Sequence, residues 1–248
     1  MPSIKGNLLT KLGFPILATI CFKRIGMEYN SKCITLEEAG HTLKIYHSNK
    51  RDMVWDIWSV LVGTFFCKEY AWLDVKDKFV IDIGGYVGDS ALYFMAHGAK
   101  GITVYEPSEE SYGYLKKNVS ENGFYNKIKV VNGALWSPPE EKRGALKWNK
   151  DSAYRYEEKS QSVMSLTLKQ IVNKEKKHRN LVLKMDCEGA EYGLLAQKDM
   201  KRTLRSFTQI IMEYHDGYVD IKRLFEAAGF TVIVDGLMPR GHLFAIKL

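Results

Sequence analysis

The chain has 248 residues, of which 46% are hydrophobic and 26% are charged, and its net charge is +7 at pH 7. This length and balance suit one large or two small globular domains, and they exclude a disordered or a fibrous chain. The basic residues gather in short runs such as 174–180 and 201–205, which more often solvate a helix face than bind a phosphate-rich partner.

Four separated cysteines and a short apolar segment near the start bear on the compartment. No CxxC pair and no Cys/His cluster has zinc spacing, so we expect reduced thiols in a cytoplasmic protein. The segment 12–22 is shorter than the about 20 residues of a membrane span and lacks a convincing cleavage site. We therefore expect neither an integral membrane segment nor a signal peptide, with a peripheral membrane-contacting helix as the alternative.

Residues 1–77 are predicted to form an N-terminal extension packed on the core. Alternating apolar and polar residues over 42–47 predict a strand, and apolar residues at helical spacing over 52–73 predict an aromatic-rich helix. The aromatic residues of this region are expected to cover the edge of a core rather than to form a binding site. They are Trp55, Trp58, Phe65, Phe66 and Trp72.

From residue 78 to residue 248, predicted strands and helices alternate in what we expect to be one domain. Val/Ile-rich runs separated by helices indicate a parallel sheet with helices on both faces. Strands are predicted at 79–84, 101–107, 128–136, 180–189 and 209–217, and helices at 89–98, 108–123, 166–177, 190–204 and 219–229.

The last two predicted strands, 230–236 and 241–248, are joined by only four residues. Such a short connection cannot make a parallel crossover, so this pair must be antiparallel. We therefore expect an α/β fold, a Rossmann-like three-layer sandwich whose seven-stranded, mostly parallel sheet ends in an antiparallel C-terminal hairpin.

The stretch 80–90 reads VIDIGGYVGDS, an apolar strand followed by a glycine-rich turn. It lacks the GxxxxGK[ST] of a P-loop, and Tyr86 occupies the second glycine position of a GxGxxG dinucleotide motif. The pattern that fits is Asp-x-Gly-x-x-x-Gly, in which Asp82 suits a cationic ligand such as S-adenosylmethionine better than a phosphate. The tight turn and close backbone approach are assigned to Gly84, Gly85 and Gly88.

Further residues expected to contact S-adenosylmethionine, the donor, lie at or just after the ends of the first three predicted strands. Asp89 and Ser90 begin a helix, where they either receive the methionine carboxylate or act only as a cap. Glu106, before Pro107, stands 22 residues after Gly84 and can accept hydrogen bonds from both ribose hydroxyls. The third strand places three residues where an adenine edge and face would lie, namely Asn132, Gly133 and Ala134.

Four stretches, in chain order, resemble the FkbM-type methyltransferases: VIDIGGYVGDS, VYEPSEESYGYLKKNVSENG, LVLKMDCEGAEYGLL and IIMEYHDG. The family blocks read like DIGANxG, EPxxxxxxxLxxN, LKIDVEGxE and ExH, and the resemblance covers about residues 78–235, with KMDCEGAE its most specific part. It implies methyl transfer from S-adenosylmethionine to a hydroxyl of a small molecule or a saccharide.

The chain departs from the family pattern at Tyr86, Gly85 and Cys187, where the family usually has asparagine, alanine and valine. The first departure is expected to matter most, because the lost amide could change how the turn is held or how the methionine moiety is contacted.

Candidate catalytic residues follow the fourth and fifth strands, since the site of a parallel sheet lies beyond the carboxyl ends of its strands. Asp186 and Glu188 follow the fourth strand, and Glu213 and His215 follow the fifth. His215 is the expected general base because its ordinary pKa lies near neutrality. Asp186 is expected to serve both catalysis and donor binding, with Glu213 beside it.

Structural alternatives stand beside these assignments. Glu188 could instead face a helix dipole, and Glu191 reads as first-turn helix charge. Lys184 is expected in a buried ion pair with a neighbouring acid, for which Glu213 is the candidate. Asp186, Glu213 and His215 could bind Mg²⁺ or another divalent ion, although no metal is our prediction.

Two other functions stay open from the sequence. Positive charge and aromatic residues are compatible with an RNA methyltransferase, and the departure at Tyr86 is compatible with a non-catalytic nucleoside-binding or scaffold protein. The polar interval 136–162 is either an acceptor-binding flap or a surface hairpin. The sequence names neither the acceptor nor the oligomeric state.

Overall fold

A computed structural model describes residues 28–30, 33–47, 60–135, 164–235 and 239–247 of the chain. The apolar segment 12–22, the first part of the predicted aromatic helix and the interval 136–162 lie outside these described residues, as do Trp55 and Trp58. Within the described ranges, no helix is long and apolar enough to cross a membrane.

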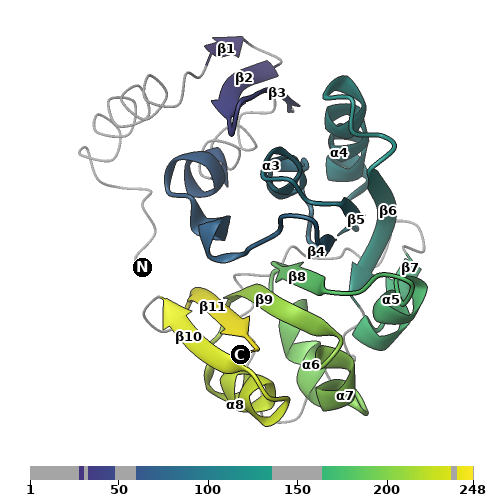
Figure 1. The fold of residues 1–248 in the computed structure, drawn as a ribbon, viewed down its shortest axis with the longest axis vertical. Coiled ribbons are helices and arrows are strands. Elements are labelled where there is room, and N and C mark those ends of the chain that lie inside the picture. Colours follow the sequence, from purple (N-terminus) through teal and green to yellow (C-terminus); the bar gives the residue numbers. More distant parts are fainter. Residues whose placement is uncertain (1–27, 31–32, 48–59, 136–163, 236–238, 248) are drawn as a thin grey trace.

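The main sheet has eight strands in the order β10-β11-β9-β8-β4-β5-β6-β7 (Figure 1). The strands from β4 to β9 run parallel, whereas β11 is antiparallel to both β9 and β10. Their bounds are β4 Phe79–Ile83, β5 Gly101–Glu106, β6 Ile128–Leu135, β7 Met164–Leu166, β8 Leu181–Met185, β9 Phe207–Tyr214, β10 Thr231–Asp235 and β11 Gly241–Ile246. The predicted α/β fold with a C-terminal hairpin is confirmed.

The strand count differs from the prediction by one. The additional strand is β7, which pairs with the end of β6 through Gly133–Met164, Ala134–Ser165 and Leu135–Leu166. Its three residues are too few to give an alternating pattern in the sequence.

Helices cover both faces of the sheet, as Figure 1 shows. On one face lie α3 (Asp89–Ala96) and α4 (Glu109–Glu121), and on the other lie α5 (Leu168–Lys174), α6 (Gly193–Ala196), α7 (Met200–Leu204) and α8 (Val219–Ala227). Each face has its own buried apolar cluster. The single helix predicted over 190–204 is divided into η4 (Ala190–Tyr192), α6 and α7, because Gln197 is extended and Asp199 has a φ of 58°.

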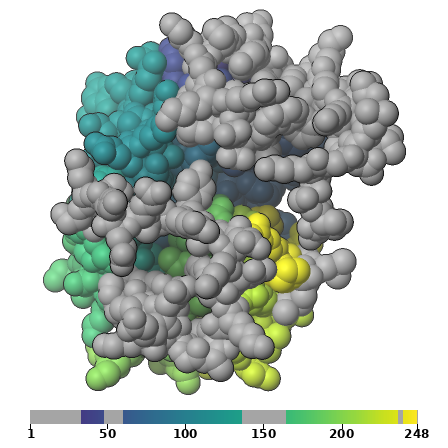
Figure 2. All heavy atoms as spheres, turned by 180° about the vertical axis from the view of Figure 1, so that it is seen from behind, coloured from purple at the N-terminus to yellow at the C-terminus, as the bar shows by residue number. Residues whose placement is uncertain are grey.

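The N-terminal segment adds a second, antiparallel sheet of β1 (Glu28–Asn30), β2 (Cys33–Glu38) and β3 (His41–Tyr46). The strand predicted over 42–47 is thus confirmed as β3. The side chains of Asn118 and Asn122 on α4 each accept from and donate to backbone groups of β3. Figure 2 shows the purple residues of this sheet beside the teal residues of α4.

The helix predicted over 52–73 is confirmed only in part by its described residues. Val60 and Leu61 are helical and lead into η1 (Val62–Phe66), a π-helix, but the helix then breaks at Lys68, which has a φ of 56°, before η2 (Glu69–Trp72), a 3₁₀-helix. Phe65 is fully buried in the same apolar cluster as α3, as expected of a packing residue, whereas Trp72 is 54% exposed. The boundary between an extension and a domain at residue 77 stays a prediction.

The strand register brings the candidate residues to one edge of the sheet. Ile83 at the end of β4 pairs with both Tyr105 of β5 and Met185 of β8, and Met185 pairs with Met212 of β9. The candidate residues therefore all lie at the carboxyl ends of parallel strands, which is where α/β sheets bind ligands. They are the glycine turn, Glu106, Asp186 and Glu213.

Candidate active site

The glycine turn after β4 fits tightly against β8. Gly84 has a φ of 83°, and a Cβ atom there would lie 1.6 Å from the carbonyl oxygen of Asp186. The backbone N–H groups of Gly84 and Gly85 both donate to the carbonyl of Tyr105, at 2.9 and 3.1 Å. Only glycine at position 84 allows the turn and the end of β8 to approach this closely.

Tyr86, the departure from the family pattern, has a φ of 43°. Asparagine adopts such left-handed backbone more readily than a bulky residue does, which explains why the family's usual residue suits this position. The backbone N–H of Tyr86 donates to Glu106 Oε2 at 2.8 Å, and its ring packs against the apolar cluster of α3. The turn is thus held by main-chain bonds, which do not depend on a side-chain amide.

Asp82 is fully buried and engaged within the protein. Its Oδ2 accepts from Ser90 Oγ at 2.6 Å, and its Oδ1 lies 3.2 Å from Lys184 Nζ. Lys184 also donates to the carbonyl of Gly84 at 2.5 Å. Burial raises the pKa of the Asp82 carboxyl, and the ammonium opposes that rise. The partner of Lys184 is therefore Asp82, whereas the sequence suggested Glu213.

Asp89 and Ser90 begin α3, but neither caps it. The N-cap is Gly88, and no side chain accepts a hydrogen bond from the first amides in this part of the structure. Asp89 is 3% exposed and accepts from Thr64 Oγ1 at 2.8 Å, and burial raises its pKa to about 7. Because the cap alternative fails, the free amides of the first turn are available to a ligand carboxylate.

Glu106 lies at the end of β5 with both carboxylate oxygens bonded. Oε2 accepts from the N–H of Tyr86 and Oε1 from the N–H of Ser108, each at 2.8 Å. Burial raises the pKa of this carboxyl to about 7. Each oxygen keeps a further lone pair, so the group can still accept from two hydroxyls.

Asn132 helps to hold the turn after β5 rather than standing free. Its Nδ2 donates to the carbonyl oxygens of Glu106 and Pro107, at 3.1 and 3.3 Å. Gly133 and Ala134 follow in β6, opposite β7. The residues assigned to the nucleoside thus form one connected group.

His215 lies at the centre of a second group, beyond the ends of β8 and β9. It is 7% exposed, and its Nδ1 lies 2.8 Å from Glu191 Oε1. Its Nε2 faces three more carboxylates, at 3.4 Å from Glu188 and at 3.8 Å from both Asp186 and Glu213. The three predicted catalytic residues are therefore brought together, and two further glutamates join them.

Glu191 is the residue that the sequence interpretation missed. It lies in the first turn of η4, as predicted, but it is fully buried, and its Oε2 accepts from the N–H of Gly189 at 2.7 Å and from the thiol of Cys187 at 3.4 Å. The available signal was the last glutamate of the KMDCEGAE block.

The protonation of this group differs from the expectation of a near-neutral histidine. Burial lowers the pKa of His215, but the bond to Glu191 and the surrounding carboxylates outweigh burial and raise that pKa to about 9. Burial and the charge of Asp186 raise the pKa of Glu213 to about 8. With these pKa values, His215 is mainly an imidazolium and Glu213 mainly a protonated carboxyl at neutral pH.

The same side chains meet the geometric needs of a divalent ion. Three possible ligand atoms lie within 4.8 Å of one another, one each from Asp186, Glu188 and His215. Glu188 thus takes the place that the sequence gave to Glu213 in a metal set. Two oxygens and one imidazole suit Mg²⁺ or Mn²⁺, and a carboxylate bond to the other ring nitrogen is typical of metal-binding histidines. The positive charge at this position can be a proton on His215 or a metal ion.

Comparisons with known proteins bear on the family. A family model described as "Methyltransferase FkbM domain" matches residues 82–232. Uncharacterized protein 158B of Sulfolobus islandicus rod-shaped virus 1 is 46% identical over 50 residues, which are 20% of this chain and 32% of the viral protein. The chain therefore spans about a third of that relative's length.

Solved structures of methyltransferases are similar to this chain at low sequence identity. An rRNA methylase from Streptococcus thermophilus is 10% identical, with a TM-score of 0.46 over 75% of this chain and 96% of its own. Magnesium protoporphyrin IX methyltransferase from Synechocystis PCC 6803, solved with bound S-adenosylmethionine, is 12% identical, with a TM-score of 0.44 over 97% of this chain and 93% of its own.

Proposed function

The chain belongs to the methyltransferase FkbM family, and on that premise we propose that it transfers a methyl group from S-adenosylmethionine to a hydroxyl of a small molecule or a saccharide. The observation that carries the proposal is the anchored imidazole of His215, whose Nε2 faces carboxylates at the carboxyl ends of the parallel strands. A cytoplasmic setting is part of this proposal, and it is supported by the thiols of Cys67 and Cys187, which form no disulfide among the described residues.

The donor half of the site is assigned to the connected group around the glycine turn. Glu106 would accept from the ribose hydroxyls, and the first turn of α3 would receive the methionine carboxylate. Asp82 and Ser90 would serve mainly to hold the glycine turn in place, because the Ser90 hydroxyl donates to Asp82 and Asp82 pairs with Lys184. The full set of donor residues is Asp82, Gly84, Gly85, Tyr86, Gly88, Asp89, Ser90, Glu106, Pro107, Asn132, Gly133, Ala134 and Asp186.

S-adenosylmethionine, when bound, supplies a methyl group on a positively charged sulfur. The residues of this chain must hold an acceptor hydroxyl in line with that group and remove its proton. Nε2 of neutral His215 would take the proton, and Glu191 would stabilise the resulting imidazolium through Nδ1. Asp186 and Glu213 would orient the hydroxyl beside Nε2. An oxygen–carbon bond forms, the sulfur–carbon bond breaks, and S-adenosylhomocysteine leaves.

Two features of the site argue against an RNA methyltransferase and against a scaffold protein, namely its charge and the contact between His215 and Glu191. Four carboxylates surround His215, so a nucleic-acid phosphate near the transfer site would be repelled despite the positive net charge of the chain. A scaffold protein would have no need for a histidine anchored by a fully buried glutamate. A hydroxyl on an uncharged acceptor suits this environment.

Two measurements test the proposal in sequence. Calorimetry with S-adenosylhomocysteine should give binding, and no binding of it or of S-adenosylmethionine would overturn the proposal. Transfer of radiolabelled methyl groups into a fractionated cell extract should then label a fraction that ribonuclease does not remove. Loss of the label after ribonuclease treatment would favour the RNA methyltransferase instead.

A further inference from the structure

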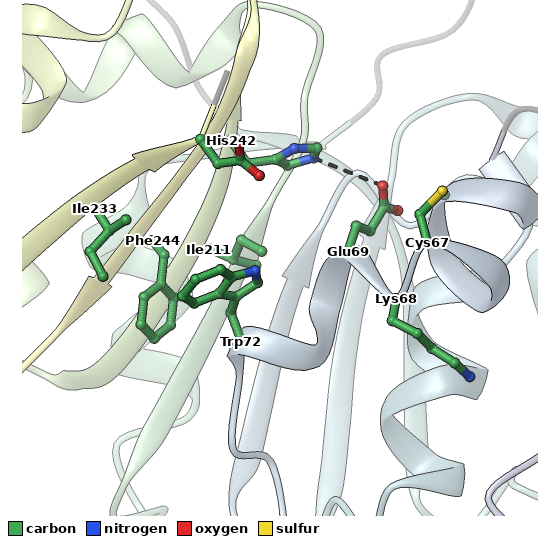
Figure 3. Close-up of a pocket in the computed structure, with 10 residues that line it drawn as sticks. Cys67, Lys68, Glu69, Trp72, Ile211, Ile233, His242 and Phe244 are labelled. Atoms are coloured by element: carbon green, nitrogen blue, oxygen red, sulfur yellow. Dashed lines mark ion pairs between the residues drawn. The ribbon is translucent and has the colours of Figure 1, made fainter. Parts of the chain in front are cut away.

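A pocket of about 310 Å³ lies between η2 and the C-terminal strands, outside the residues assigned above (Figure 3). One end of it is apolar and the other is charged. The apolar lining consists of Trp72, Ile211, Ile233 and Phe244, and the polar lining includes Lys68, Glu69, Asp235 and His242.

The apolar end presents two tilted aromatic rings, of which the indole of Trp72 is the more exposed. Trp72 is 54% exposed, and its ring centroid lies 5.8 Å from that of Phe244 at an interplanar angle of 45°. Ile233 beside them is 44% exposed. An indole offers a broad apolar face together with an N–H donor, which suits a ligand that is itself apolar on one side and polar at its edge.

The charged end is held in place by the residues around it. Glu69 Oε2 lies 3.9 Å from His242 Nε2, as the dashed line in Figure 3 shows, and Glu69 Oε1 lies 3.1 Å from Thr64 Oγ1, whose single proton it shares with Asp89. A Cβ atom on Gly63 would lie 2.6 Å from Glu69 Oε2, so glycine at this position of the π-helix η1 leaves room for the carboxylate. Such π-helical turns occur frequently at functional sites.

The pocket lies next to the catalytic group along β9, because two of its lining residues neighbour Glu213 in the sheet. Ile211 and Glu213 are two residues apart in one strand, so their side chains lie on the same face of the sheet. His242 of β11 is directly opposite Glu213, and Phe244 is directly opposite Ile211. Glu213 in turn lies 3.8 Å from His215. A ligand in the pocket would reach the proposed base at its charged end.

We propose that this pocket binds the part of the acceptor that does not react, and that the acceptor is a saccharide. The apolar face of a pyranose ring would pack on Trp72, and its hydroxyls would donate to Glu69 and Asp235 and bind His242. A simple phenol has too few hydroxyls to satisfy these carboxylates. A phosphorylated ligand would meet their negative charge, since the one lysine of the lining, Lys68, is already paired with Glu38. This inference rests on the proposed function, whose acceptor class it narrows.

Saturation-transfer NMR with neutral methyl pyranosides of glucose, mannose and rhamnose tests the assignment on the full chain with S-adenosylhomocysteine present. The ring protons should receive saturation from the protein, and Trp72→Ala should reduce the effect by about five-fold or more. Tyr125→Ala is the matched control, because Tyr125 is also an exposed aromatic residue, at 66%, and does not line the pocket. Glu69→Gln should weaken the effect, whereas Tyr125→Ala should leave it unchanged.

Three results would overturn the inference: no saturation of any pyranoside, equal saturation in Trp72→Ala, or saturation of 4-methylphenol but of no pyranoside. Calorimetry of S-adenosylhomocysteine on the same samples keeps the two proposals apart. If S-adenosylhomocysteine binds while the pyranosides fail, the saccharide assignment falls and the donor half of the proposed function stands. If Trp72-dependent pyranoside binding occurs without S-adenosylhomocysteine binding, the proposed function falls instead.

Discussion

Glu191 Oε1 lies 2.8 Å from Nδ1 of His215, and both side chains are buried. This contact fixes the ring so that Nε2, the other nitrogen, faces Asp186, Glu188 and Glu213. A carboxylate bonded to one nitrogen of a histidine also stabilises the charge that the ring acquires when it takes a proton. The buried glutamate thus sets both the orientation and the basicity of the proposed base.

Replacement of that carboxylate by an amide should separate the two effects. In Glu191→Gln the charge is lost but the shape is kept, so the pKa of His215 should fall from about 9 toward its ordinary value. NMR titration of the His215 ring, assigned with His215→Asn, measures this directly. Above about pH 9, where the ring is largely neutral in both forms, methyl transfer should fall about 10- to 100-fold because an amide cannot stabilise the imidazolium, while affinity for S-adenosylhomocysteine stays unchanged. Glu226→Gln, on the exposed face of α8, is the control. An unaltered His215 titration would contradict the assignment.

The raised pKa values predict an unusual pH dependence of turnover. The base works only after His215, with a pKa of about 9, and Glu213, with a pKa of about 8, have lost their protons. Since deprotonation increases with pH, kcat/KM should rise through the neutral range and level off above about pH 9. Because His215 and Glu213 interact, the two apparent pKa values in this profile belong to the pair and not to either residue alone. Rates measured from about pH 6 to about pH 10 test this. A rate that falls across that range would show that a protonated group is needed.

Much of the fold could be predicted because its signals are local and repeated. The strands β4, β5, β8 and β9 are short apolar runs that end in polar residues, and each is followed by a helix or a turn signal. What failed depended on contacts made elsewhere in the chain. The region of η1 and η2 has helical spacing of apolar residues, yet it must turn at Lys68 to reach both α3 and the C-terminal strands.

The site divides in the same way. Residues at strand ends, such as Asp186 and His215, were predicted because the topology of a parallel sheet decides where they lie. The roles of Glu191 and Asp82 could not be read from spacing, since each is decided by a partner far along the chain, His215 and Lys184. Trp72 was predicted to be a packing residue, but it is exposed in the structure. The exposure of an aromatic side chain depends on the packed structure and could not be read from its neighbours in sequence.

The ribose assignment predicts a loss of donor affinity when Glu106 is changed. In Glu106→Gln one oxygen becomes an N–H₂ group, which cannot accept from either a backbone N–H or a hydroxyl. Affinity for S-adenosylhomocysteine should fall about 10- to 100-fold, as expected for hydrogen bonds to a charged group. Calorimetry measures the change, with Glu109→Gln at the exposed start of α4 as the control. Equal affinity in the Glu106 variant would remove it from the ribose site.

Treatment with a chelator distinguishes the two possible sources of positive charge among the carboxylates, a proton on His215 and a bound metal ion. Because His215 has a raised pKa, its proton already supplies a positive charge beside Asp186 and Glu188. We therefore expect dialysis against EDTA to leave methyl transfer unchanged, and Mg²⁺ or Mn²⁺ to add nothing. Loss of turnover after EDTA, restored by one of these ions, would instead assign Asp186, Glu188 and His215 as metal ligands.

The close approach of Gly84 to Asp186 predicts that one added methyl group damages both halves of the site. In Gly84→Ala the new carbon would lie 1.6 Å from the Asp186 carbonyl oxygen, at a φ of 83° that alanine rarely adopts. The end of β8 must then move, and with it the residues around His215. We expect a loss of about 2 kcal/mol or more in the free energy of unfolding, together with weaker donor binding.

Gly113→Ala is the matched control for this change. Gly113 lies within α4 and has no atom within 4 Å of an added Cβ, so alanine there should be neutral or stabilising by up to about 1 kcal/mol. Urea denaturation followed by fluorescence measures both variants, and calorimetry measures S-adenosylhomocysteine binding by the folded fraction. If Gly84→Ala were as stable as Gly113→Ala and bound the donor product equally well, the turn would not be fixed by its contact with β8.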